Sequence, residues 1–394
     1  MKIKANKILV IATRRLGDVL LVTPLLRSLR KAYPNAEIDM LVYKNTAAIL
    51  EGNPDYNHLI PVSERPKFKE YKSLFKQIFR RYDLAISTLA SDRPLIYAIL
   101  AAPKRIAIVP PRRWQDAWKR LAVQAWTELD DKNTHTIIQN LRLADLLDIA
   151  RSYEVVTPQS ANSINRLDKF DKSLPFAVLH LAPMYRYKRW TIDGWQKIAD
   201  YLTQAGLKVV LTGGTAKEEI AYINEALAKM PDTVLNLAGK LRFSEVSELI
   251  RTSKIYIGPD TAVTHLAAAT GVPTIALFGP TNPLKWAPWP YNYALDKTPF
   301  NFKGTKKVAN VVLLQGKGIC VPCHQEGCEQ HRQSSSRCLE EIDSATVIKW
   351  IETLIRANNW SARLPCTPTP LISDLWLLKS YTLGSTKKIT YPKT

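Results

Sequence analysis

The segment Ile255–Trp289 constrains the fold more than any other part of this chain. It holds a short apolar run, a helix that opens at Asp260 and ends at Gly271, and a second apolar run over Pro273–Phe278. Strand, turn, helix and strand with breakers at the joints are typical of a parallel α/β unit. Such sheets bind ligands at the carboxyl ends of their strands. The features expected at that edge are Asp260, Thr261, His265 and the turn Gly279-Pro280-Thr281.

The same alternation of strands and helices occurs twice, which predicts two α/β domains in a chain of 394 residues. The first series opens with a strand at Lys7–Thr13 and a helix at Asp18–Tyr33, and the second opens at Phe176. After Thr298 the pattern loosens, and the next predicted element is a helix at Ser344–Asn358. We predict an N-terminal domain over 1–160, a C-terminal domain over 174–343, and a helix with an irregular tail over 344–394. This last segment is a candidate to pack back on the N-terminal domain.

The formal net charge of +20 is the main oddity of the composition. Lysine and arginine cluster in Arg65–Arg81 and Lys104–Arg120, with aromatic residues between them. These runs are either solvated helix faces or the contact for an anionic partner. That partner could be membrane lipid, a phosphorylated glycolipid or, least favoured because no nucleic-acid module is visible, a nucleic acid. With no apolar run of about 20 residues and no signal peptide, we expect a cytoplasmic protein without a transmembrane helix.

Two turns at strand ends are candidates to bind phosphate. Gly213 and Gly214 follow one strand and precede a helix that begins with Glu218 and Glu219. Glycines there let backbone N–H groups approach a phosphate, although an ordinary tight turn explains them as well. A carboxylate after the turn either favours the helix dipole or holds a ribose diol. Lys188 lies in a second, basic loop that suits a diphosphate or is simply solvated.

Asp18 and His265 each allow two interpretations. Asp18 lies at the first strand-to-helix turn, where it either stabilises the helix dipole or acts as a general base facing the cleft between the domains. His265 lies one turn after Thr261 and is either a ligand contact or a hydrogen-bonded structural residue. The residue types alone do not decide between these roles.

A cluster of cysteines follows the second domain's strands. Its members are Cys320, Cys323, Cys328 and Cys338. Zinc ligation is one interpretation of this C-x2-C-x4-C-x9-C spacing, which is not that of a common zinc finger. Disulfides are not expected in a reducing cytoplasm. Structural zinc is therefore a candidate only.

Taken together, five motifs resemble glycosyltransferase family 9, the ADP-heptose:lipopolysaccharide heptosyltransferases. The motifs are RRLGDVLLVTPLLRSLRKAYPNAEIDMLV, YKRWTIDGWQKIADYL, LTGG, LNLAGK and GPDTAVTHLAAATGVPTIALFGPTNPLKWAPW. They occur in the family's order and lie in both predicted domains. The resemblance implies a GT-B fold, in which two Rossmann-like α/β domains with parallel sheets face each other across a cleft. The nucleotide sugar would bind the C-terminal domain and the acceptor the N-terminal one.

The resemblance also implies roles for individual residues. Asp18 matches the family's catalytic base, and Lys188 matches the lysine that holds the diphosphate. Glu218 or Glu219, which the sequence does not separate, matches the acid that binds the ribose. The family's D-T-G-x-x-H element is matched by Asp260, Thr261 and His265, with Ala262 in place of its glycine.

The expected activity is inverting transfer of heptose from ADP-heptose to a lipid A-linked lipopolysaccharide core, with no cofactor and no metal required for catalysis. The partners would be the nucleotide-sugar donor and an anionic lipid-linked acceptor, met in peripheral contact with the cytoplasmic face of the inner membrane, and no nucleic acid. The alternatives are a GT-B transferase for another nucleotide sugar, and a non-catalytic basic protein that binds glycolipid or nucleic acid.

Overall fold

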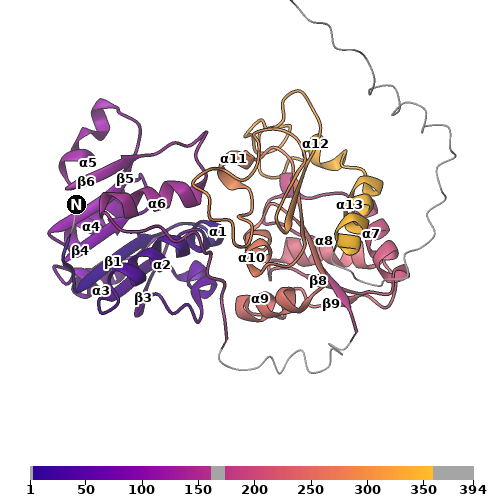
Figure 1. Ribbon diagram of the computed structural model, residues 1–394, viewed down its shortest axis with the longest axis horizontal. Helices are drawn as coiled ribbons and strands as arrows, with labels where there is room; N and C mark the ends of the chain where they lie inside the picture. The colour runs from indigo at the N-terminus through magenta and orange to yellow at the C-terminus, as the bar shows by residue number, and fades with distance from the viewer. Residues whose placement is uncertain (1–2, 161–173, 358–394) are drawn as a thin grey trace, which may run out of the picture.

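The chain folds into two α/β halves that lie side by side, as the computed structural model shows (Figure 1). It describes residues 3–160 and 174–357. The domain limits at 160 and 174 stay a proposal, because the chain between them lies outside these ranges. No helix within the described ranges is long and apolar enough to cross a membrane.

The N-terminal half is built on a six-stranded parallel sheet in the order β3-β2-β1-β4-β5-β6. Its strands are β1 Lys7–Ala12, β2 Glu37–Tyr43, β3 His58–Val62, β4 Leu84–Ser87, β5 Lys104–Val109 and β6 Ala125–Glu128. Its helices are α1 Leu16–Leu20, α2 Thr23–Ala32, η1 Lys44–Leu50, α3 Phe68–Ile78, α4 Asp92–Ala101, η2 Trp114–Asp116, α5 Ala117–Leu121 and α6 Thr136–Leu146. The order reverses beside β1, which pairs with both β2 and β4. A ligand crevice is expected at such a switch point.

The C-terminal half repeats this topology in the order β9-β8-β7-β10-β11-β13, with β12 added antiparallel at the edge. Its strands are β7 Phe176–His180, β8 Lys208–Thr212, β9 Leu235–Asn236, β10 Ile255–Pro259, β11 Thr274–Phe278, β12 Lys306–Val308 and β13 Val311–Gln315. Its helices are η4 Arg186–Lys188, α7 Ile192–Gln204, α8 Lys217–Leu227, α9 Phe243–Thr252, α10 Ala262–Thr270, α11 Pro283–Trp286, α12 Arg337–Glu340 and α13 Ser344–Ala357. Here β7 is the strand at the switch point, paired with β8 and β10.

The apolar core is continuous between the halves. Val19 and Leu20 of α1 belong to the same buried cluster as Val263 and Leu266 of α10. Trp289, which is 2% exposed, belongs to this cluster too. Burying large side chains of both halves together holds α1 against α10.

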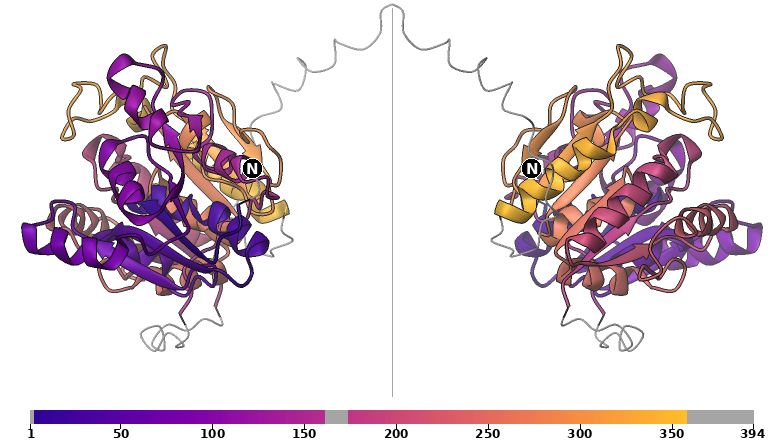
Figure 2. Two further views of the ribbon diagram at one scale, coloured as in Figure 1. Left: turned by 90° about the vertical axis from the view of Figure 1, so that its left-hand side faces the viewer. Right: turned by 90° about the vertical axis from the view of Figure 1, so that its right-hand side faces the viewer.

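Helix α13 packs on the C-terminal half. Val347 and Ile351 share a buried cluster with Trp195 and Ile198 of α7. Figure 2 shows α13, in yellow, on the outer side of that half. The rest of the predicted segment 344–394 lies outside the described residues.

The structure corrects the prediction of one helix over Asp18–Tyr33, because α1 ends at Leu20 and α2 begins at Thr23. Pro24 has no N–H to continue the α1 hydrogen-bond ladder. The hydroxyl of Thr23 donates to the carbonyl oxygen of Leu20 at 2.7 Å instead. This break orients α1 independently of the longer helix.

The sequence analysis also missed three strands, β6, β12 and β13. β13 lies in the region after Thr298 where the pattern loosens, yet it pairs with β11 and is buried along its whole length. β6 closes the edge of the first sheet and alternates between half-buried and exposed residues. A short run such as VVLLQ is ambiguous in isolation, because only pairing makes it a strand.

Candidate active site

Asp18 lies in a pocket at the carboxyl edge of the N-terminal sheet, directly after β1. Side chains from several elements line this pocket, among them Arg14, Thr88, Asp130, Gln139 and Lys285. Lys285 belongs to α11 and so comes from the other half of the molecule. The Asp18 side chain is 13% exposed, and its Oδ1 atom lies 3.5 Å from Nε of Arg14. A carboxylate here can reach a ligand that enters between the halves.

The surroundings of Asp18 make it a stronger base than an exposed aspartate. Burial raises the pKa of Asp18 above its ordinary value, and the charges of Arg14, Arg15 and Lys285 oppose this increase without cancelling it. A raised pKa brings a carboxylate closer to the working pH, which favours general-base catalysis.

The first turn of α1 meets the donor-side helix α10. A Cβ atom placed on Gly17 would lie 3.6 Å from Cδ2 of His265 and 3.8 Å from Cα of Ala262. Figure 1 shows α1 and α10 next to each other at the centre of the molecule. The residue beside Asp18 therefore touches the helix that begins at the predicted donor site.

Lys188 and Asp260 form an ion pair between the ends of β7 and β10. Nζ of Lys188 lies 2.5 Å from Oδ2 of Asp260, and the hydroxyl of Thr281 donates to the same oxygen at 2.7 Å. Burial acts to lower the pKa of Lys188, but the Asp260 carboxylate outweighs it and keeps this pKa above its ordinary value. The structure thus brings Lys188 to Asp260 and Thr281, which the sequence placed in a different motif.

Thr261 caps the helix that follows Asp260. Its hydroxyl oxygen accepts from the N–H of Thr264 at 3.3 Å, which satisfies one of the free donors in the first turn of α10. The N-terminus of α10 carries a partial positive charge at the same edge as Lys188. This charge suits an anionic ligand.

His265 is buried in α10 and is neutral at working pH. Burial lowers its pKa to about 4, although the Asp260 carboxylate raises it in part. Within the described chain, no hydrogen-bond partner is found for its Nδ1 atom. A buried polar nitrogen without a protein partner is energetically costly. The Nδ1 atom of His265 is therefore a candidate to bind a ligand.

The glycine turn distinguishes between the two glutamates. Oε2 of Glu219 accepts from the N–H of Gly214 at 3.0 Å. A Cβ on Gly214 would lie 2.5 Å from that same oxygen, and one on Gly213 would lie 2.4 Å from Ile223. The side chain of Glu218 is exposed instead, and only its carbonyl oxygen accepts from Arg189. Glu219 is therefore the better candidate for the ribose.

The cysteine loop packs against the turn Gly279-Pro280-Thr281. The carbonyl oxygen of Pro280 accepts from the N–H of His324 at 2.9 Å, and a Cβ on Gly279 would lie 3.4 Å from Sγ of Cys338. Sγ of Cys328 accepts from the N–H of Arg337 at 3.4 Å. In the part of the chain that is described, the cysteines do not bring three sulfur atoms within 4.8 Å of one another. The zinc predicted there stays a prediction.

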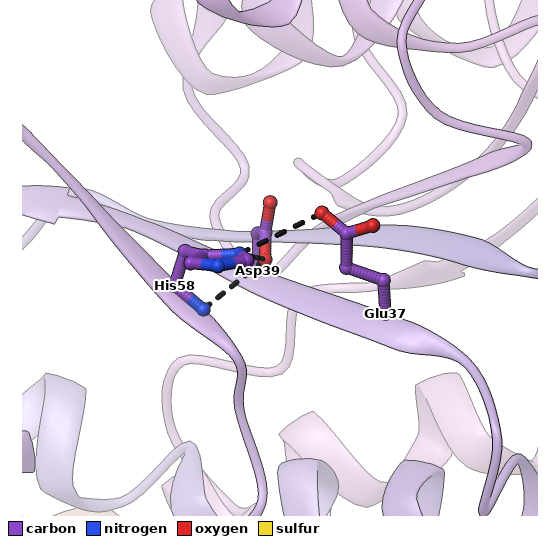
Figure 3. A group of neighbouring side chains, drawn as sticks. All are labelled: Glu37, Asp39 and His58. Carbon is purple, nitrogen blue, oxygen red and sulfur yellow. Dashed lines mark hydrogen bonds and ion pairs between the residues drawn. The ribbon is translucent and has the colours of Figure 1, made fainter.

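Another group has the chemistry of metal ligands, but its atoms are already in use. Figure 3 shows His58 with its ring toward Glu37 and Asp39, at 3.6 Å and 3.0 Å from their oxygens. The other oxygen of Asp39 accepts from Tyr82 at 2.7 Å, and Lys7 pairs with Glu37 at 2.7 Å. The group lies at the start of β2 and β3, the end opposite Asp18. It is a hydrogen-bond network that allows Asp39 to be buried.

The sequence analysis missed Lys285 and Arg15 as members of the site. Lys285 forms an ion pair with Asp131 and so links the two halves beside the Asp18 pocket. Arg15 lies over the ring of Tyr185 at 5.0 Å, and its charge is felt by both Asp18 and Lys188. Both residues stood in quoted motifs: Lys285 follows the turn at Thr281, and Arg15 precedes Asp18 by three residues.

Comparisons with known proteins agree with this architecture. A family model described as glycosyltransferase family 9 (heptosyltransferase) matches residues 71–307. Lipopolysaccharide heptosyltransferase 3 of Escherichia coli strain K12 is 33% identical over 293 residues, which cover 70% of this chain and 83% of that protein.

Solved structures have the same fold. The glycosyltransferase family 9 protein of Veillonella parvula DSM 2008 superposes with a TM-score of 0.71 at 20% identity, covering 91% of this chain and 99% of that one. Escherichia coli ADP-heptose LPS heptosyltransferase II gives 0.68 at 22% identity, covering 89% and 99%. The predicted GT-B fold is confirmed. The chain is a glycosyltransferase and belongs to glycosyltransferase family 9, the heptosyltransferase family.

Proposed function

We propose that this enzyme transfers heptose from ADP-heptose to the core of a lipopolysaccharide, with inversion at the anomeric carbon. The observation that carries the proposal is the position of Asp18, in a pocket shared with Lys285 and next to the helix that follows Asp260. Two of the proteins reported above are named as lipopolysaccharide heptosyltransferases, and one of these is also named for ADP-heptose. They do not favour another nucleotide sugar or a purely binding role.

The chemical step uses one base and several cations. Asp18 accepts the proton of an acceptor hydroxyl as that oxygen bonds to the anomeric carbon. The bond from this carbon to the diphosphate breaks on the opposite side, and the electron pair leaves with ADP. Lys188, Arg15 and the N-terminus of α10 stabilise the negative charge that develops on the diphosphate.

The donor would lie along the carboxyl edge of the C-terminal sheet. Glu219 accepts hydrogen bonds from the ribose hydroxyls, and the N–H of Gly214 in the glycine turn holds its carboxylate in place. Asp260 and Thr281 hold the Lys188 ammonium in place. Since cations of the chain serve the leaving group, the proposed step requires no cofactor.

The acceptor would be an anionic, lipid-linked oligosaccharide at the cytoplasmic face of the inner membrane. A formal net charge of +20 favours such an acceptor and the membrane that contains it. The Asp18 pocket offers the side chains of Arg14 and Lys285 to its acidic groups.

Structural zinc in the cysteine loop is a separate proposal. Four cysteines lie in one loop, which touches the donor edge at Pro280, and thiolates are the ligands that structural zinc prefers. Metal analysis of protein purified without chelator tests it directly. One zinc per chain, lost when Cys323 and Cys328 are replaced by serine, supports the site; metal-free, fully active protein rejects it.

The function is tested by a panel of donors and acceptors read by mass spectrometry. We expect the mass of one heptose to be added to a lipopolysaccharide core acceptor from ADP-heptose, and not from UDP or GDP sugars. Equal transfer from another nucleotide sugar would contradict the assignment of ADP-heptose as the donor. Tight binding of the acceptor without any transfer would reject the enzyme activity.

A further inference from the structure

Helix α3 presents apolar side chains to solvent on a face that should be polar. Phe68, Tyr71, Phe75 and Phe79 are 83%, 42%, 42% and 42% exposed. Their spacing places Phe68, Tyr71, Phe75 and the C-cap residue Phe79 along one stripe, next to the stripe of Leu74 and Ile78 that packs into the core. A surface helix of a globular protein is normally apolar only where it packs on the core.

Cations alternate with these aromatic residues. Lys69, Lys72 and Lys76 of α3 are exposed, and no ion pair to an acid is recorded for them within the described ranges. The acid in this helix is Glu70, which Lys44 and Ser63 already bind at 2.7 Å and 2.6 Å. The helix therefore offers both apolar surface and unbalanced positive charge.

A second group of the same kind lies between β5 and β6. Trp114 is 94% exposed, Leu121 is 87% exposed and Trp118 is 38% exposed. Arg112 and Arg113, directly before them, are exposed as well. Large aromatic and aliphatic side chains are seldom this exposed without a partner.

The start of α4 joins the two groups. Arg93 donates to the carbonyl oxygen of Glu64, in the loop before α3, at 2.6 Å. Asp92 pairs with Lys119 of α5 at 2.6 Å. Figure 1 shows α4 between α3 and α5. The exposed side chains of α3, η2 and α5 thus form one region, which we call the aromatic–basic surface.

This region begins at the edge of the sheet that carries Asp18. Phe68, Asp92 and Trp114 each follow the carboxyl end of a strand, β3, β4 and β5 respectively. Carboxyl ends of parallel strands lie at one edge, and Asp18 follows β1 there. A partner bound to this surface would lie at the same edge of the sheet as the Asp18 pocket.

We propose that the aromatic–basic surface docks on an anionic lipid bilayer. This rests on the proposed function, in which the acceptor is anchored in a membrane. Trp, Tyr and Phe with interleaved Lys and Arg are the composition of interfacial segments, where rings enter the headgroup boundary and cations meet anionic lipid. Docking there would present the headgroup sugars to Asp18 without extracting the lipid.

Vesicle sedimentation of the full-length enzyme tests the proposal. The probes are vesicles of phosphatidylcholine alone and of phosphatidylcholine mixed with phosphatidylglycerol. The combined variant Phe68→Ser, Trp114→Ser, Leu121→Ser should lower partitioning onto anionic vesicles by roughly tenfold or more. Lys69→Gln, Lys72→Gln, Lys76→Gln should lower it roughly a hundredfold at low salt. The control, Leu295→Ser in the C-terminal half, removes an apolar side chain that is 50% exposed and should bind like wild type.

Activity assays separate this proposal from the proposed function. The aromatic variant should lose turnover of the lipid-linked acceptor in vesicles yet keep wild-type turnover of the same acceptor freed of its fatty acids. Wild-type partitioning by the aromatic variant would overturn the docking surface, as would equal binding of wild type to neutral and anionic vesicles. Anionic-vesicle binding by a wild-type enzyme that turns over neither acceptor would instead support docking and overturn the proposed function.

Discussion

Cations around Asp18 tune its basicity, and Lys285 is the one that comes from the other half. Its positive charge lowers the pKa of Asp18, which burial raises. In Lys285→Met the pKa of Asp18 should rise further, because one positive charge is removed. The acidic limb of the kcat/KM profile should therefore move to higher pH by up to about one unit.

The pH profile of the variant with a deacylated acceptor measures this shift. Lys197→Met is the control, because Lys197 is exposed and pairs with Asp193, and its profile should match wild type. A limb that stays in place or moves to lower pH would contradict the role given to Lys285.

Lys188 forms an ion pair with Asp260 and is proposed to bind the donor diphosphate. Two variants separate the structural role from the binding role. Lys188→Met leaves the buried Asp260 carboxylate without its ion pair, which should cost about 3 kcal/mol of unfolding free energy. Adding Asp260→Asn should restore most of that stability but not donor binding. Urea unfolding and ADP titration of both variants check this. Recovery of ADP binding in the double variant would mean that Lys188 acts only on Asp260.

At the residue scale the sequence pointed to many of the candidate residues but not to all of their partners. Asp18, Lys188 and Asp260 stood in motifs at strand ends, so their edge of the sheet could be expected. The choice of Glu219 over Glu218 depends on which side chain turns toward Gly214. The position of Lys285 in the Asp18 pocket depends on how the two halves pack together. Neither is encoded in a local pattern.

At the scale of elements, α10 depends on its cap. Thr261→Ala removes the hydroxyl that accepts from Thr264 and should cost about 1 kcal/mol of stability. Thr261→Ser keeps the cap and should remain close to wild type. Thermal unfolding with and without ADP compares them. Equal melting temperatures for the two variants would show that the cap does not stabilise α10.

Elements with a strong pattern were predicted well, and the misses have local causes. β1 and β11 lie within one residue of the bounds predicted for them, Lys7–Thr13 and Pro273–Phe278. Pro24 divides a helix whose leucine spacing continues through the break, so periodicity alone did not reveal it. β13 is an interior strand only because β11 and β12 pair with it on either side. Pairing between distant segments is not visible in a short apolar run.

The whole molecule should lose stability in mild acid because three of its histidines are buried and neutral. Burial lowers the pKa of His135 to about 3 and those of His180 and His265 to about 4. The unfolded chain binds protons below about pH 6.5, and the folded chain does not. Stability is therefore fully present above that pH and falls toward pH 4, by up to about 1.4 kcal/mol per pH unit for each histidine.

Melting temperatures between pH 7 and pH 4 measure this loss. His135 joins the halves through a bond to the carbonyl oxygen of Ala287 at 2.8 Å, and its Nδ1 atom accepts from Ile137. His135→Asn can keep the N-cap and removes the titrating group, so its stability should fall less steeply with acid. His331→Asn is the control, because His331 is exposed, and its stability should fall with acid as steeply as that of wild type. The same slope in His135→Asn and wild type would contradict the assignment.

The central claim is that a base from one half serves a donor held by the other. Asp18→Asn keeps the shape of the side chain and removes its ability to accept a proton. The most direct measurement pairs transfer, read by mass spectrometry, with ADP binding, read by calorimetry, on this one variant. We predict that transfer falls by at least about a hundredfold while the affinity for ADP stays near wild type. Turnover close to wild type, or loss of ADP binding together with transfer, would contradict the account.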